Sequence, residues 1–88
     1  MATKGFFAQN IGQVVKTPLA SFNKEALKSC QIKCNLAFVS SSGESFTAVF
    51  FKAAYEQTLL SKSQVKVVGK VQANSSGTGY IIFVQGIE

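Results

Sequence analysis

The sequence predicts an all-β fold, a five-stranded barrel with one short helix between the third and fourth strands. Apolar and polar residues alternate with period two over several short segments, as they do in half-buried strands. Clusters of Ser, Asn, Thr and Gly at 40–43 and 74–79 separate these segments as turns. With 88 residues, 47% of them hydrophobic, the chain is expected to form one domain, residues 1–88, around one small core.

The first strand is predicted over 6–16, because Pro18 lacks the N–H group that a continued sheet ladder needs. The next segment, 19–28, allows two interpretations. One is a short strand with a turn at 23–24, and the other is a helical turn through 24–28. Both interpretations stay open at the level of sequence.

The second strand has the clearest alternation, with an apolar inner face and a more polar outer face. The predicted inner residues are Ile32, Cys34, Leu36 and Phe38, and the outer ones are Gln31, Lys33, Asn35 and Ala37. The turn at 40–43 then predicts a hairpin into the third strand, 45–51. In that strand Thr47 favours an outer face that it shares with Val49 and Phe51.

The helix is predicted over 52–60, where Phe51, Tyr55 and Leu59 fall on one face. The fourth strand is predicted over 64–72, with an inner and an outer face. Its inner residues are Val65, Val67, Gly69 and Val71, and Lys66, Lys70 and Gln72 point outward.

The fifth strand, 80–87, is apolar on both faces over 80–84, which indicates cover on both sides. Five strands with a helix between the third and fourth form the element order of the OB fold, a Greek-key barrel.

The charge balance predicts a polyanionic partner. Nine lysines, no arginine and four glutamates give a net charge of +5, which is typical of proteins that bind nucleic acid or a membrane surface. Lysine contacts phosphates well but lacks the bidentate fork that reads guanine, so contact independent of base sequence is expected. The alternative is that the lysines only confer solubility.

The chain is expected to be cytoplasmic and not bound to a membrane. No apolar run approaches the roughly 18 residues of a membrane span, and residues 1–5 lack the apolar stretch of a secretory signal.

The chemical inventory predicts that the protein is not an enzyme. Histidine and aspartate are both absent, and the four glutamates are dispersed, so no catalytic residue is assigned. Cys30 and Cys34 would lie about 13 Å apart in an extended segment, too far for a disulfide. They are therefore expected to be free thiols in a reducing compartment, with no metal site and no cofactor.

Four segments resemble one known family in order and spacing. They are Asn-Ile-Gly-Gln-Val-Val-Lys-Thr-Pro at 10–18, Asn-Leu-Ala-Phe-Val at 35–39, Ala-Val-Phe-Phe-Lys-Ala-Ala-Tyr-Glu at 48–56, and Ser-Gln-Val-Lys-Val-Val-Gly-Lys-Val-Gln at 63–72. The chain is similar in these segments to the bacterial single-stranded DNA-binding protein (SSB) family. The resemblance implies an OB fold and sequence-nonspecific binding of single-stranded DNA in replication, recombination or repair. The alternatives are an RNA-binding or primosome-type OB adaptor, and a structural protein without a nucleic-acid role.

The chain departs from the family pattern at several points. It has no tryptophan, Ser45 stands where an aromatic residue commonly opens the third strand, and no acidic tail follows Glu88. It therefore resembles a minimal member, from a bacterial cell, a phage or another mobile element.

Binding of a single strand without base specificity combines a basic groove with aromatic rings on which bases stack. The predicted nucleic-acid-binding residues are Lys33, Asn35, Phe46, Phe51, Lys52, Lys66, Lys70 and Tyr80, with Lys16 and Phe22 ranked after them. The resemblance independently matches Phe51 to a base-stacking phenylalanine. As alternatives, Phe51 anchors the helix through Tyr55, Phe46 belongs to the core, Tyr80 caps the barrel end, and the lysines are solvated.

A homodimer or homotetramer is also predicted. The outward apolar residues of 81–84, together with Val68, exceed what the interior of one small barrel can cover. Exposed strand edges also invite symmetric pairing.

Overall fold

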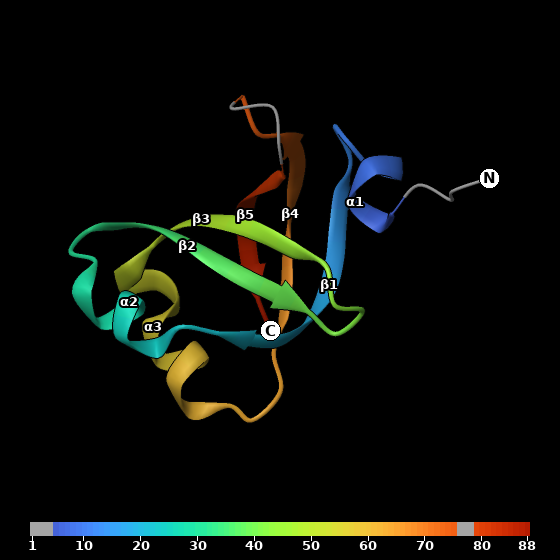
Figure 1. Ribbon diagram of the computed structural model, residues 1–88. Helices are drawn as coiled ribbons and strands as arrows, with labels where there is room; N and C mark the ends of the chain where they lie inside the picture. The colour runs from blue at the N-terminus through green and yellow to red at the C-terminus, as the bar shows by residue number, and fades with distance from the viewer. Residues whose placement is uncertain (1–4, 76–78) are drawn as a thin grey trace.

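The structure, a computed structural model that describes residues 5–75 and 79–88, is a closed barrel of five strands (Figure 1). The strands are β1 (Val14–Phe22), β2 (Lys33–Ser40), β3 (Ser45–Phe51), β4 (Lys66–Ala73) and β5 (Tyr80–Ile87). Their order is β1-β2-β3-β5-β4, and pairing of β1 with β4 closes the barrel. Only the β3–β5 pair is parallel among these strands. Helix α3 (Lys52–Ser61) joins β3 to β4, so the predicted OB-fold class is confirmed.

The start of the first strand was predicted wrongly. Helix α1 (Phe6–Gln9) occupies its first residues, and β1 begins only at Val14. Phe7 is buried, with its ring centroid 5.1 Å from that of Phe46, so α1 covers one end of the barrel. Gly12, at φ +83°, then turns the chain into β1, a backbone conformation that glycine adopts without steric penalty.

The predicted stop at Pro18 was also wrong, because β1 runs through it. The ladder at this point needs no N–H from Pro18: the next residue, Leu19, donates to the carbonyl of Val65 at 2.9 Å. Opposite Pro18, Lys66 makes both of its backbone bonds to Glu88 instead. The carbonyl of Pro18 accepts from Ser41 at 3.0 Å. A proline is tolerated in a strand at a position where the sheet requires no backbone N–H donor.

Of the two interpretations of 19–28, the helical turn is the correct one beyond Asn23. β1 continues to Phe22, and helix α2 (Lys24–Ser29) follows. Asn23 caps α2, because its Oδ1 accepts from the backbone N–H groups of Glu25 and Ala26 at 2.9 and 3.2 Å. Helices α2 and α3 lie side by side at one end of the barrel (Figure 1).

The prediction of free thiols was wrong: Cys30 and Cys34 form a disulfide. The spacing argument assumed an extended chain, whereas Cys30 ends α2 and the chain bends before β2 begins at Lys33. Their Cα atoms are therefore only 5.5 Å apart. The disulfide ties the end of α2 to the buried face of β2.

The inner faces predicted for the strands form the core, with one exception. Ile32 precedes β2 and is 75% exposed. The buried hydrophobic residues include Phe7, Val15, Leu27, Cys34, Leu36, Phe38, Phe46, Ala48, Phe50, Leu59, Val65, Val67, Val71 and Ile82. Gly69 is also buried, and the site has no room for a side chain, because a Cβ there would lie 2.6 Å from Ile82 Cγ2 and closer still to the carbonyl oxygen of Phe83.

Candidate nucleic-acid interface

The outer surface of β2, β3, β5 and β4 brings several predicted residues together. Lys33 and Phe51 are direct cross-strand partners at the end of the sheet next to α3. In the next row, successive partners cross four strands: Asn35 on β2, Val49 on β3, Phe83 on β5 and Lys70 on β4. This surface, defined by Lys33, Asn35, Phe51, Lys70 and Phe83, is the stacking face.

Two phenylalanine rings stand out from the stacking face. Phe51 is 63% exposed and Phe83 is 46% exposed. A hollow of about 260 Å³ has both residues in its wall, together with Lys33 and Val49. Exposed rings on each side of a hollow leave π faces accessible to flat ligands, and stacking on such rings is how bases are held without sequence preference.

The structure separates the two roles considered for Phe51. The ring that packs on the helix is that of its neighbour Phe50, which is 3% exposed and has its centroid 6.2 Å from that of Tyr55. Phe51 itself is the N-cap residue of α3 and points outward. The ring that packs on Tyr55 of the helix is therefore that of Phe50, and the Phe51 side chain is exposed.

The ammonium group of Lys52 has protein partners. Its Nζ donates to the carbonyl oxygens of Lys28 and Cys30, at 3.1 and 2.9 Å, and lies 3.5 Å from the Glu56 carboxylate. The two carbonyls belong to the C-terminal end of α2, which carries partial negative charge. Lys52 thus joins α3 to α2 and is not part of the stacking face.

Phe46 and Tyr80 lie at the other end of the barrel from Phe51. Phe46 is 3% exposed and belongs to the core. Tyr80 is half-buried, and its ring centroid is 5.9 Å from that of Phe7, which fits the barrel-capping role. Residues 76–78, part of the turn predicted before Tyr80, lie outside the described residues. Phe22 is half-buried beside Phe38, with 5.2 Å between ring centroids.

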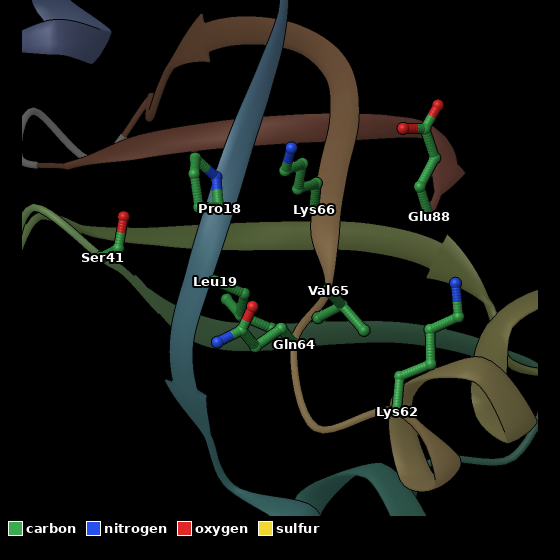
Figure 2. A pocket seen from close by; sticks show the side chains of 8 residues that line it. All are labelled: Pro18, Leu19, Ser41, Lys62, Gln64, Val65, Lys66 and Glu88. Atoms are coloured by element: carbon green, nitrogen blue, oxygen red, sulfur yellow. The ribbon is translucent and has the colours of Figure 1, made fainter.

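Lys66 belongs to a different part of the surface. It lines a pocket of about 480 Å³ with Pro18, Lys62 and Glu88, shown in Figure 2. Glu88 Oε2 is 2.8 Å from the Nζ of Lys16. The hydrogen bond and charge of Lys16, aided by the charges of Lys66 and Lys62, lower the pKa of the Glu88 carboxyl.

Comparison with models of protein families, with curated proteins and with solved structures finds no match.

Two further observations concern the described part of the chain. It holds no group of three or more His, Cys, Asp or Glu side chains placed to bind a metal ion. None of its helices is long and apolar enough to cross a membrane.

Sequence reasoning missed Phe83 as a site residue. The period-two rule already pointed to it: in a strand apolar on both faces, placing Ile82 inside puts Phe83 outside. Lys62 was missed because the sequence does not show that a lysine at the end of α3 lies near β1. The pockets that Lys62 lines depend on the closure of the barrel.

Proposed function

We propose that this protein binds single-stranded DNA without base specificity, through the stacking face. One observation carries the proposal: Phe51 and Phe83 are both exposed beside one hollow, with Lys33 and Lys70 as their direct cross-strand neighbours. Bases would stack on the rings and phosphates would lie against the ammonium groups. The strand 2–3 surface is the usual ligand face of OB folds, which supports the assignment.

The residue types on this face favour a single strand over a duplex. In a duplex the bases are stacked on one another, so their faces are not accessible to Phe51 or Phe83. The absence of arginine from the chain favours contact with phosphates over reading of base edges. Asn35 adds one side-chain amide for a sugar or base contact.

The resemblance to the SSB family supports the same function. We therefore propose a role in replication, recombination or repair, as an SSB-like protein of a bacterial cell, a phage or another mobile element. We place that role in the cytoplasm. The argument from free thiols to a reducing compartment falls with the Cys30–Cys34 disulfide, and the support for this location comes from the resemblance.

A titration with three labelled ligands of equal length tests the proposal: oligo-dT, oligo-U and a DNA duplex. We expect oligo-dT to bind more tightly than the duplex at the same salt concentration, since pyrimidine strands unstack easily. Equal affinity for duplex and oligo-dT would refute single-strand binding. Tighter binding of oligo-U than of oligo-dT would move the function to RNA, and no binding of any of the three would leave the adaptor or structural alternatives.

We also propose that the working unit is a homodimer or homotetramer. Val14 and Ile11, on and just before β1, are 55% and 47% exposed, and Val14 is the direct partner of Lys70 beside the stacking face. Covering these residues with a second copy would place two stacking faces next to each other and raise avidity. Sedimentation at micromolar concentration should show a mass of two or four chains. A mass near the 9.4 kDa of one chain, with and without oligo-dT, would refute self-association.

A further inference from the structure

A second groove crosses the barrel away from the stacking face. It consists of the pocket in Figure 2, about 480 Å³, and an adjoining hollow of about 260 Å³. The two share Leu19, Lys62 and Val65 in their walls, so they adjoin each other between β1 and the segment that leads from α3 into β4. No residue that lines it also lines the hollow between Phe51 and Phe83. We call it the lysine groove.

The lysine groove is positively charged. Lys24, Lys62 and Lys66 line it, and among the described residues none of the three forms an ion pair. Glu88 is the one acidic residue among those that line it, and its carboxylate is already paired with Lys16. Figure 2 shows Lys62 extending from the end of α3 toward the Glu88 side of the pocket. An anionic ligand is therefore the complementary one.

The groove offers less aromatic surface than the stacking face. Its apolar wall is formed by aliphatic residues such as Leu19 and Val65, and Phe22, its aromatic residue, is half-buried against Phe38. Serine and glutamine side chains supply hydrogen-bonding groups between the lysines; these are Ser21, Ser41, Ser63 and Gln64. Ammonium and hydroxyl groups beside a single half-buried ring suit a phosphate backbone better than bases.

Strand β4 connects the groove to the stacking face. Lys66 and Lys70 both point outward from β4, four residues apart, which is about 13 Å along a strand. Lys70 is the cross-strand partner of Phe83, and Lys66 lines the groove. A strand that leaves the stacking face at Phe83 can therefore follow Lys70 and Lys66 into the groove.

We propose that the lysine groove binds the phosphate backbone of the same single strand whose bases occupy the stacking face. This inference rests on the proposed function and extends it. The protein holds a short strand by stacking alone and a longer strand by stacking plus phosphate contacts with Lys66, Lys62 and Lys24.

The test compares two oligo-dT lengths, about 5 and about 16 nucleotides, which bracket the usual range of one OB fold. Lys62→Gln removes the charge common to both parts of the groove. Lys28→Gln is the matched control, because Lys28 is an exposed lysine of α2 that lines neither part. For each variant, log K is measured against log salt concentration, after melting curves establish that the variant is folded.

We expect Lys62→Gln to reduce the magnitude of the salt slope of the 16-mer by about 0.7, the value of one phosphate contact on a single strand. The slope of the 5-mer should not change, and Lys28→Gln should change neither slope. An unchanged 16-mer slope in Lys62→Gln, with the wild type still binding both lengths, would overturn the inference and leave the proposed function standing. Failure of the wild type to bind either length would instead refute the proposed function.

A competitor distinguishes the other anionic occupant, an acidic peptide. A poly-glutamate peptide is titrated into the wild type and into Lys62→Gln. If Lys62→Gln weakens binding of the peptide but leaves the 16-mer slope unchanged, the groove is a peptide site and the proposal is wrong.

Discussion

Replacing Phe51 with alanine should weaken binding at only a small cost to the stability of the fold. The ring is 63% exposed, so of about 200 Å² of side-chain surface only about 75 Å² is covered. At about 25 cal/mol per Å² this burial contributes at most about 2 kcal/mol. Alanine keeps the Cβ, so we expect Phe51→Ala to lower the free energy of unfolding by about 1 kcal/mol. Loss of a stacked base costs about 1–3 kcal/mol, an affinity loss of about 5- to 140-fold for oligo-dT.

The adjacent residue provides the matched control. Phe50 is 3% exposed and packs on Phe38 and Tyr55, with ring centroids 5.9 and 6.2 Å away. Phe50→Ala should therefore cost about 3–5 kcal/mol of stability, as buried phenylalanines do. Phe50 and Phe51 are neighbours on β3 but point to opposite faces. Replacing Phe50 should therefore reduce mainly stability, and replacing Phe51 should reduce mainly binding.

The assay pairs thermal melting with an oligo-dT titration below the melting temperature of both variants. In a domain of this size, about 1 kcal/mol lowers the melting temperature by roughly 4–8 °C. We expect Phe51→Ala to melt within that range of the wild type and to bind weakly. Phe50→Ala should melt much lower and, per folded molecule, bind normally. If Phe51→Ala binds oligo-dT within about twofold of the wild type, the stacking face is wrongly assigned.

Three further predictions follow from the disulfide, from Gly69 and from the lysines. Reducing the Cys30–Cys34 disulfide should lower the free energy of unfolding by about 2 kcal/mol, from the chain entropy of so short a loop. A melting temperature that stays the same when a reductant is added would contradict this prediction. The variant with both cysteines replaced by alanine is the control. Gly69→Ala should destabilise the barrel by about 1–3 kcal/mol in denaturant, because its Cβ meets β5, whereas Gly86→Ala, with no atom within 4 Å, should not. For three to five phosphate contacts on a long oligo-dT, the slope of log K against log salt should be roughly −2 to −3.5, and a slope near zero would exclude a basic binding surface.

Much of the barrel followed from the sequence because alternation along a strand is a local property. When Leu36 and Phe38 face inward, Lys33 and Asn35 must face outward, whatever the rest of the chain does. The same rule placed Lys66 and Lys70 outside on β4 and distinguished Phe50 from Phe51 on β3. The helix between β3 and β4 and the hairpin at 40–43 were predicted from equally local patterns.

What the tertiary structure decided depends on contacts between segments distant in sequence. Phe7, in the helix of residues 6–9, is buried against Phe46 of β3, a contact between segments about 40 residues apart that a local pattern does not reveal. Cys30 and Cys34 meet because α2 ends where β2 begins, a bend that alternation does not reveal. The outward lysines illustrate the same limit. Alternation along a strand predicts which way the side chain of a strand lysine points, but only the neighbouring segments determine what a lysine contacts. Lys66 lines the lysine groove and Lys70 lies beside Phe83. Lys52, in α3, binds the end of α2.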